Sequence, residues 1–405
     1  MNSSKLNYGR TLLLGFGFLA SSLAWSLYNA LVPTMLESRF LLTTSQIGII
    51  MTIDNIFGVI FQPVVGTLSD RSNTKIGKRM PWILFALPIS AIFFSLIPTA
   101  SELKMMMFFI IGFNFFMSLW RSPVIALMPD LTPPPLRSKA NGLINLMGGI
   151  GAIIAFFVGG RLANHDPTNK ISFGMGSATM VFSLIMLLLF VREPKLSLNF
   201  ETNKEKKKRS KLRLSRAELQ SLALILGAIF FWFAAYNAIE TFFTLYAVNV
   251  LGVKAGTATM ILSAFSLSFV AFAFPAALVA GKLGRKRTIL TGLTILLVCF
   301  LPILFLRSVA LVLALLLVGG IGWAMVNINS LPMVVELAGS EKIGEFTGFY
   351  YFASFSASIA SPILFGWIRD LSGDYNLLFI YALIAFGIAF GLMLGVKHGE
   401  SSNTP

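Results

Sequence analysis

Charged residues are scarce in this sequence. Asp, Glu, Lys and Arg make up 12% of its 405 residues, whereas ordinary soluble domains contain about 25%. Hydrophobic residues reach 56%, which is more apolar surface than one soluble core of this size can bury. We therefore expect long segments of the chain to face lipid.

Cysteine and histidine are nearly absent too. The one cysteine, Cys299, lies in an apolar run, so an intramolecular disulfide is excluded. With two histidines, in a loop and in the tail, no Cys/His metal cluster is readable. Neither a P-loop nor a Gly-x-Ser-x-Gly nucleophile pattern occurs. We predict no metal, no cofactor and no enzymatic activity, and no transport driven by ATP through a P-loop.

Twelve apolar segments are long enough to cross a bilayer, which takes about 20 residues. A spanning segment must be helical, because every backbone N–H in lipid needs an internal partner. We therefore predict an all-α, multi-pass protein of the cell membrane. The predicted spans are 11–36, 46–69, 81–99, 103–128, 139–163, 172–191, 219–247, 256–281, 288–306, 309–335, 345–368 and 376–396.

The Lys and Arg residues orient the chain and divide it. With the N-terminus inside, 24 of the 32 lie in predicted cytoplasmic segments and seven on the opposite side, while Arg121 lies within a span. Because cytoplasmic loops carry the excess of basic residues, we predict that both termini are cytoplasmic. The long basic linker 192–217 separates two predicted six-helix bundles, 1–191 and 218–405.

The net charge of +15 is thus a topology signal, and we expect no nucleic-acid partner. The linker could bind anionic lipid, but a solvated loop is the favoured interpretation. A short repeat relates the two halves: Leu127-Met-Pro-Asp130 and Met333-Val-Val-Glu336 are offset by 206 residues, as are the glycines that follow them at 142 and 348. A parallel repeat places such residues at equivalent positions.

The segment 66–82, between the second and third spans, carries a charged loop. Gly66 permits close helix contact, Asp70 ends the second helix where basic residues can pair with it, and Gly77 permits a tight turn. Such a network can hold one state of a transporter shut, although a positive-inside loop with a turn glycine would look similar. We assign these residues to a predicted cytoplasmic gate: Gly66, Asp70, Arg71, Gly77, Lys78, Arg79, Asp130, Arg137 and Glu336.

This loop resembles the signature loop of the major facilitator superfamily. Its spacing, Gly-x-x-Ser-Asp-Arg followed by Gly-Lys-Arg-x-Pro-Trp, is similar to that of a narrower group, the glycoside–pentoside–hexuronide cation symporters, and within it to the proton-coupled sucrose transporters. Gln62-Pro63 and Arg121-Ser-Pro-Val-Ile-Ala-Leu-Met-Pro-Asp130-Leu131 match the same pattern. The resemblance covers most of the first half. It implies proton-driven uptake of a sugar, often a disaccharide such as sucrose or maltose.

In the second half, the corresponding loop Gly281-Lys-Leu-Gly284-Arg285-Lys286-Arg287 is a degenerate copy without the aspartate, which weakens the expectation of a lock there. Melibiose permease, a member of the group, carries its cation-site acids at positions that match Gly58 and Gln62 here. The resemblance therefore favours a proton over sodium as the coupling ion.

Three ionisable residues lie well inside predicted spans: Asp54, Glu240 and Arg121. A charge in mid-membrane costs several kcal/mol, so such a group should face a cavity, pair or titrate. We assign these three residues to proton coupling. Two alternatives stay open: Asp54 and Arg121 form a static buried bridge, and Glu240 lies near enough to the surface to be partly solvated.

Sugars present hydroxyl groups and an apolar ring face, so amide and carboxylate side chains beside aromatic rings suit them. Several spans carry such residues at helical spacing. Packing or interhelical hydrogen bonding is the plainer explanation for any one of them. The predicted substrate contacts are Trp25, Tyr28, Asn29, Asn55, Asn114, Trp120, Arg121, Trp232, Tyr236, Asn237, Glu240, Trp323 and Asn327.

The favoured function is proton-coupled sugar symport by alternating access, by a monomer in the lipid bilayer. A major facilitator exporter of lipid, drug or metabolite is the alternative transporter. A membrane sugar sensor without transport would usually add a soluble signalling domain, and only nine residues follow Val396.

Overall fold

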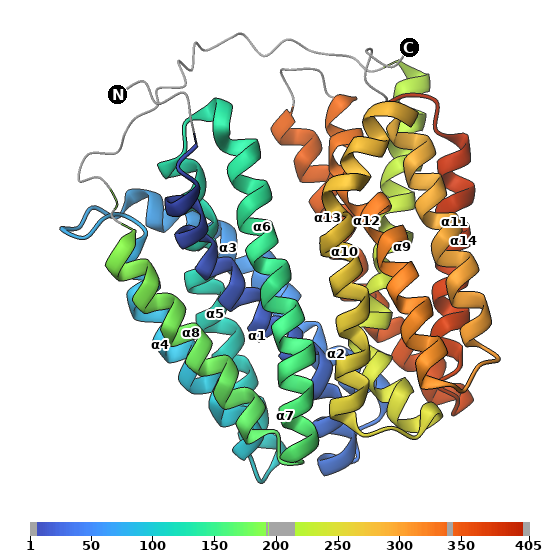
Figure 1. Ribbon diagram of the computed structural model, residues 1–405, viewed down its shortest axis with the longest axis horizontal. Helices are drawn as coiled ribbons and strands as arrows, with labels where there is room; N and C mark the ends of the chain where they lie inside the picture. The colour runs from blue at the N-terminus through green and yellow to red at the C-terminus, as the bar shows by residue number, and fades with distance from the viewer. Residues whose placement is uncertain (1–5, 192, 194–214, 338–342, 400–405) are drawn as a thin grey trace. The chain divides into compact units, whose positions relative to one another are not determined.

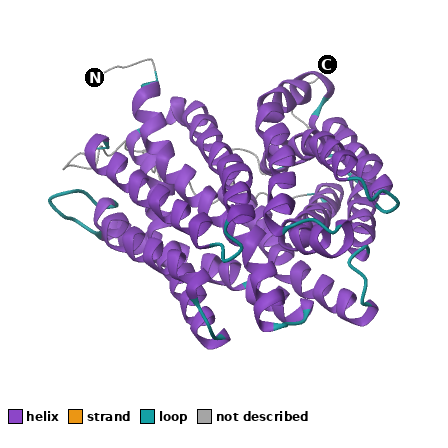
Figure 2. Ribbon diagram, turned by 60° about the horizontal axis from the view of Figure 1, so that its bottom comes forward, coloured by secondary structure: helices purple, strands orange, loops and turns teal. Residues whose placement is uncertain are grey.

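The computed structural model describes residues 6–191, 193, 215–337 and 343–399, and most of them are helical (Figures 1 and 2). Twelve helical segments within these ranges are long and apolar enough to cross a membrane. Each overlaps one predicted span, which confirms the all-helical, multi-pass prediction. Apart from an isolated bridge between Thr74 and Gly77, the described ranges contain no strand pairing. Most of the predicted linker 192–217 lies outside them.

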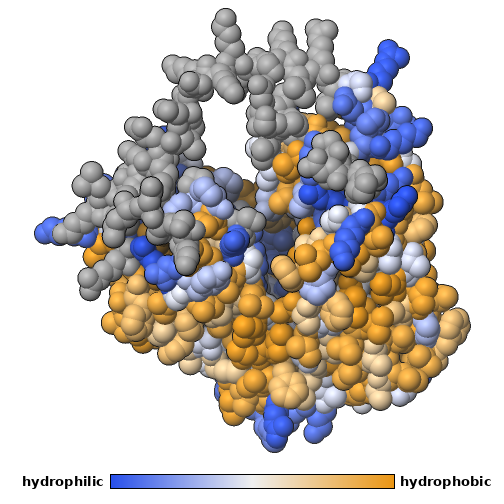
Figure 3. Space-filling model, turned by 45° about the horizontal axis from the view of Figure 1, so that its top comes forward, coloured by the Kyte–Doolittle hydropathy of each residue, from blue (hydrophilic) through white to orange (hydrophobic). Residues whose placement is uncertain are grey.

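Hydrophobic side chains cover most of the middle of the surface in Figure 3, and hydrophilic side chains gather toward its upper and lower ends. A membrane-spanning protein requires this distribution, because only its ends meet water. Buried residues fill the interior of each helix bundle, including the rings of Trp120 and Trp232, neither of which is exposed at all.

The described residues form two compact units. Unit 1 comprises 6–40, 53–191, 193 and 255–260. Its helices are α1 (Tyr8–Phe40), α3 (Ile53–Arg71), α4 (Met80–Leu96), α5 (Leu103–Leu131), α6 (Arg137–Ile154), α7 (Gly160–His165) and α8 (Lys170–Phe190). Short turns at Ile97–Thr99 and Pro134–Leu136 and a π-helical turn at Ala155–Gly159 connect some of them.

Unit 2 comprises 41–52, 215–254, 261–337 and 343–399. Its helices are α2 (Thr44–Met51), α9 (Arg216–Leu251), α10 (Ala255–Leu283), α11 (Arg285–Ile303), α12 (Val309–Glu336), α13 (Ile343–Ser372) and α14 (Leu377–Gly395). The first residues of α10 belong to unit 1. The units thus differ from the predicted sequence halves in the two short segments 41–52 and 255–260.

The second span is interrupted, which its continuous apolar run did not indicate. Helix α2 ends at Met51 and α3 begins at Ile53. Between them the Thr52 hydroxyl donates to the Ile49 carbonyl at 2.7 Å, and the Thr52 N–H donates to the carbonyls of Ile49 and Ile50. This tighter turn disturbs the regular i→i−4 ladder. Asp54 consequently lies in the first turn of α3.

Glycine residues set the closest helix contacts. In α6, a Cβ at Gly151 would overlap the Leu19 carbonyl oxygen of α1 and would lie 3.1 Å from the Leu19 Cα. Within unit 2, a Cβ at Gly366 of α13 would lie 2.6 Å from the Ser45 Cα of α2. Small residues let backbones approach in this way in membrane helices.

Acidic capping reinforces the α2–α13 contact. The Asp370 carboxylate accepts hydrogen bonds from the backbone N–H groups of Thr44 and Ser45, both at 2.9 Å, and from the Ser45 hydroxyl at 2.6 Å. These donors belong to the first turn of α2, where a negative charge is favourable.

The α1–α6 contact gives a direct test of packing. Gly151→Ala should lower the stability of the detergent-solubilised protein by about 1–3 kcal/mol, because the added methyl group meets backbone that cannot turn aside. Thermal unfolding measures the change. Gly142→Ala in the same helix is the matched control, since nothing lies within 4 Å of a Cβ there; equal effects of the two substitutions would contradict the packing described here.

Candidate functional site

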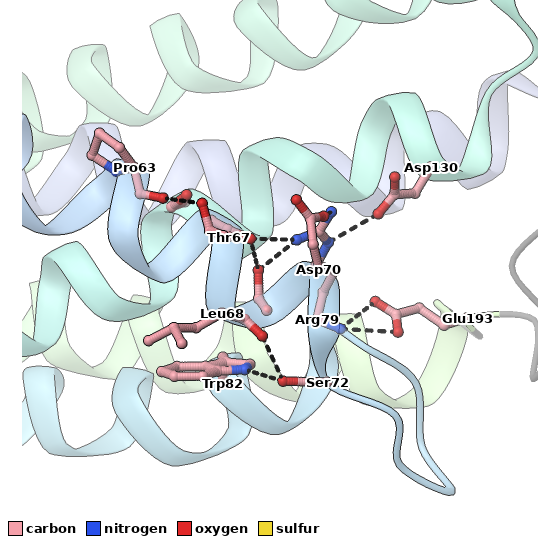
Figure 4. A network of polar contacts seen from close by, with 12 residues as sticks. Pro63, Thr67, Leu68, Asp70, Ser72, Arg79, Trp82, Asp130 and Glu193 are labelled. Carbon is pink, nitrogen blue, oxygen red and sulfur yellow. Dashed lines mark hydrogen bonds and ion pairs between the residues drawn. The ribbon is translucent and has the colours of Figure 1, made fainter. Parts of the chain in front are cut away.

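A buried guanidinium joins three helices at one end of unit 1. Arg79 immediately precedes α4 and extends toward the C-terminal ends of α3 and α5 (Figure 4). Its Nε donates to Asp130 of α5 at 2.9 Å, and its Nη2 forms an ion pair with Asp70 of α3. Its Nη1 donates to the Ser69 hydroxyl and, at 3.2 Å, to the Gly66 carbonyl. We call Arg79, Asp70, Asp130, Ser69 and Gly66 the Arg79 network.

The two sides of this network differ in exposure. The Arg79 side chain is 7% exposed, whereas those of Asp130 and Asp70 are 44% and 61% exposed. A cation that is shielded from water must keep hydrogen-bond acceptors around it, because a buried charge without partners costs several kcal/mol. The half-exposed aspartates can exchange the same contact for water. The guanidinium is therefore the anchored member of the network and the carboxylates are the releasable ones.

The other predicted gate residues of unit 1 have different surroundings. Arg71 is exposed at the end of α3, and Lys78 is half-buried. Arg137 donates to the carbonyl oxygens of Thr132 and Pro129, at 3.1 and 3.0 Å, and so satisfies the C-terminal end of α5. Of the basic residues proposed as partners of Asp70, the structure thus places Arg79 against it.

Gly77 and Gly66 both do what their spacing predicted. Gly77 has a φ of 121°, which few other residues adopt, and its N–H donates to the Thr74 carbonyl at 3.2 Å to close the turn. A Cβ at Gly66 would lie 3.1 Å from the Ser122 hydroxyl oxygen, so this glycine allows α3 and α5 to approach.

Unit 2 also contains an ion pair at the corresponding place. The missing aspartate in its loop had weakened the expectation of such a contact. Arg285, the first residue of α11, pairs with Glu336, the last residue of α12. Arg285 lies 206 positions after Arg79, and Glu336 lies 206 positions after Asp130. The missing aspartate in the second loop removes the partner equivalent to Asp70 but leaves this pair in place. Applying the 206-residue offset to Arg79 would have identified Arg285.

Asp54 lies at the interruption of the second span. Its carboxylate accepts hydrogen bonds from the Asn55 backbone N–H at 2.6 Å and from the Asn55 side-chain amide at 2.8 Å. The start of a helix favours a negative charge. Asp54 follows Thr44, the start of α2, by ten residues, and the break at Thr52 lies between them.

An aromatic cluster in unit 1 connects several predicted substrate contacts. The rings of Trp25 and Tyr28 of α1 meet edge-on, with centroids 5.8 Å apart, and both contact Phe113 of α5. The Asn114 amide donates to the Tyr28 hydroxyl at 3.5 Å. Arg121 lies over the Trp25 ring, 5.9 Å from its centroid, and Asp54 lies within electrostatic range of the Tyr28 hydroxyl. We call Trp25, Tyr28, Asp54, Asn114 and Arg121 the unit 1 cluster.

Unit 2 contains a second cluster that also combines a tyrosine, a tryptophan and a carboxyl group. The Tyr236 ring of α9 stacks on the Trp323 ring of α12, with centroids 4.4 Å apart and planes 3° from parallel. Phe233 meets Trp323 edge-on at 5.5 Å, and Glu240 lies within electrostatic and hydrogen-bonding range of Tyr236. We call Tyr236, Trp323 and Glu240 the unit 2 cluster.

A tripeptide relates the two clusters. Tyr28-Asn-Ala in α1 and Tyr236-Asn-Ala in α9 are identical and lie 208 residues apart. In both units this tyrosine contacts or stacks on a tryptophan and neighbours a carboxyl group inside a span. The repeated tripeptide could therefore have identified the two clusters as equivalent from the sequence alone.

The remaining predicted contacts are less specific. The rings of Trp120 and Trp232 are fully buried within their units, and the Asn237 amide donates to the Phe233 carbonyl of its own helix at 2.7 Å. Asn29 and Asn327 are half-buried.

The clusters lie apart from the groove between α4 and α8. No group of three or more His, Cys, Asp or Glu suited to a metal occurs among the described residues. An open groove of about 540 Å³ lies between α4 and α8 of unit 1 and is lined mainly by apolar side chains such as Pro88, Ile92, Val181 and Phe182. None of the predicted site residues lines this groove.

Twelve candidate spans, with carboxyl, guanidinium and aromatic groups inside them, define a membrane transporter. The Major Facilitator Superfamily matches residues 14–362, and the chain belongs to that family. Family and fold are those of a transporter and not of an enzyme.

Individual relatives are distant. The tetracycline resistance protein, class H, of Pasteurella multocida is 24% identical over 379 residues, or 88% of each chain. The isoprimeverose transporter of Lactiplantibacillus pentosus is 23% identical over 347 residues, which are 80% of this chain and 70% of that protein. The crystal structure of the nucleoside transporter NupG superposes with a TM-score of 0.75 at 15% identity and covers 96% of this chain and 100% of its own, which shows a common fold.

The Arg79 network generates a stability prediction. Arg79→Lys should destabilise the detergent-solubilised protein by about 1–3 kcal/mol, because one ammonium group cannot reach Asp70, Asp130 and the Gly66 carbonyl together. The half-exposed aspartates keep the loss below that of a fully buried pair. Thermal unfolding measures this loss of stability, and Arg71→Lys, at an exposed position, is the matched control. An equal loss of stability in the two variants would show that the Arg79 network does not stabilise the protein.

Proposed function

We propose that this protein is a proton-coupled sugar symporter that works by alternating access in the cell membrane. The observation that carries the proposal is the repeated cluster: each unit places a tyrosine, a tryptophan and a carboxyl group inside its membrane spans. The isoprimeverose transporter among its relatives supports a sugar as the cargo.

The aromatic rings suit one face of a sugar. Pyranose rings have an apolar face, which indole and phenol rings cover well, and a rim of hydroxyl groups that needs polar partners. The unit 1 cluster offers the Asn114 amide and the Arg121 guanidinium beside Trp25. In unit 2, the parallel Tyr236–Trp323 stack forms a rigid aromatic wall with Glu240 one helical turn from Tyr236.

Asp54 is the proposed proton carrier. A carboxylate at this depth is costly unless it is neutralised or hydrogen-bonded. The Asn55 amide and backbone N–H favour the charged form, whereas the surrounding apolar spans favour the neutral one. A change in the local surroundings between two states would shift this balance, which is what coupling requires. Glu240 is the corresponding group of unit 2.

The Arg79 network is the proposed gate. Its anchored guanidinium and releasable aspartates can stabilise one state without locking it permanently. The Arg285–Glu336 pair gives unit 2 a simpler version. With the predicted orientation, both lie on the cytoplasmic side.

Export of a drug or metabolite is the second candidate, and the tetracycline resistance protein favours it, because that match covers 88% of both chains. Substrate tests separate the two functions.

Purified protein in proteoliposomes should accumulate a labelled disaccharide, tested with sucrose, maltose and isoprimeverose, when an inward proton gradient is imposed. A gradient of one pH unit supplies about 1.4 kcal/mol per proton, which sustains at most about tenfold accumulation when one proton moves with each sugar and no membrane potential is present. Collapse of the gradient with an ionophore should abolish accumulation. Gradient-dependent tetracycline flux without any sugar flux would replace the symporter with the exporter.

Asp54→Asn should reduce accumulation to a ratio of about one while sugar exchange across the membrane continues, because the amide keeps the volume and polarity of the side chain but cannot titrate. Counterflow of labelled sugar measures exchange. Glu102→Gln, an exposed carboxyl just before α5, is the control and should accumulate as the parent does. Full accumulation by Asp54→Asn would remove Asp54 from coupling.

A further inference from the structure

A carboxyl group from a distant part of the chain holds the backbone of Arg79. Glu193 follows the end of α8 by three residues, and both of its carboxyl oxygens accept the Arg79 backbone N–H, at 3.0 and 3.1 Å (Figure 4). The Lys78 N–H also lies close enough to lower the pKa of this carboxyl group. The two segments are 114 residues apart, so this contact ties the end of α8 to the start of α4.

The start of α4 cannot satisfy these donors by itself. Arg79 is its N-cap residue, and its guanidinium cannot cap the helix because it only donates hydrogen bonds, here to Asp70 and Asp130. In a capping box the side chain three residues later accepts the N-cap N–H. Here that residue is Trp82, whose indole only donates and is bonded to the Ser72 hydroxyl at 2.9 Å. Glu193 takes over the missing role.

Gly77 leaves the space that Glu193 occupies. A Cβ at Gly77 would overlap the Glu193 carboxyl oxygen and lie 2.6 Å from its carboxyl carbon. Val191, two residues before Glu193, is 2% exposed, so a buried side chain holds the chain close to this position. The glycine of the loop therefore serves the turn and also admits this side chain.

We propose that Glu193 is a positioning residue of the gate: it fixes the Arg79 backbone so that the guanidinium reaches Asp70 and Asp130 together, and Gly77 is required partly to admit it. This inference rests on the proposed role of the Arg79 network as a gate. Burial raises the pKa of the Glu193 carboxyl, an effect that Asp130 adds to and that the N–H groups of Arg79 and Lys78 and the Arg79 charge oppose. A half-buried carboxyl is thus kept there at some electrostatic cost, as expected of a group with a specific task.

Hydrogen exchange tests the contact without any substrate. In Glu193→Ala, the peptide that contains the Lys78 and Arg79 amides should exchange about threefold to tenfold faster, as expected for loss of a cap. Glu102→Ala is the matched control, because Glu102 also precedes a helix, α5, but makes no side-chain capping bond. Unchanged exchange in Glu193→Ala would overturn the contact. If that variant fails to fold, Glu193→Gln replaces it, and about a twofold increase is expected because one acceptor oxygen remains.

Epistasis in transport tests the positioning role. Glu193→Ala should lower the maximal rate of sugar counterflow about threefold to tenfold with unchanged KM, because it disturbs the gate and not the sugar contacts. In an Arg79→Lys background the same substitution should have no further effect. A full effect in that background, or faster exchange with a normal maximal rate, would overturn the proposal.

A double-mutant cycle between Gly77→Ala and Glu193→Ala tests the steric match. The double variant should unfold at a higher temperature than the sum of the single effects predicts, since alanine at 193 removes the carboxyl overlap and leaves only the Cβ contact at 2.7 Å. Strict additivity would refute the role of Gly77 in admitting Glu193. The hydrogen-exchange and unfolding experiments need no transported sugar. If the parent protein showed no sugar flux, the proposed function would be refuted, but these two experiments would still test the contact of Glu193 with Arg79 and Gly77.

Discussion

A guanidinium that is almost wholly shielded from water must keep its acceptors, and the end of unit 1 is built around this requirement. Arg79 collects acceptors from the last turns of α3 and α5, while its own backbone is bonded to Glu193 beyond α8. Four segments of unit 1 therefore meet at one residue. Because a shielded charge cannot lose its partners at low cost, we propose that movement at this junction distinguishes two states.

The carboxyl groups inside the predicted spans also need hydrogen-bond partners, because a charge shielded from water is costly without them. Asp54 accepts hydrogen bonds from the backbone N–H and the side-chain amide of its neighbour Asn55, at the start of a helix created by the break at Thr52. Irregular backbone at membrane depth is tolerated where it serves a buried site. We propose that protonation of Asp54 and the conformation of the chain depend on each other here, because the carboxyl group lies beside the helix break at Thr52 and within electrostatic range of the Tyr28 hydroxyl.

Much of this architecture is predictable from the sequence, because lipid imposes a simple rule: long apolar runs become helices. All twelve spans were found in this way, and the spacing of Asp70 and Arg79 correctly indicated a charged junction. Glu193 was not identified, because nothing in the sequence shows that a residue at the start of the linker bonds to a loop 114 residues earlier. The break at Thr52 was missed for a related reason, since it depends on hydroxyl and N–H bonds that an apolar run does not reveal. Arg285 was readable by applying the 206-residue offset of the repeat to Arg79, and the two Tyr-Asn-Ala tripeptides, 208 residues apart, were readable from their identity.

The central claim is that sugar and proton move together and in the same direction. Proteoliposomes loaded with a pH-sensitive dye, with equal pH on both sides and the membrane potential clamped, test it most directly when the transported disaccharide is added outside. The account predicts that the interior becomes more acidic as sugar enters, and that the response disappears in Asp54→Asn. Sugar entry without a pH change, or with a more alkaline interior, would contradict it.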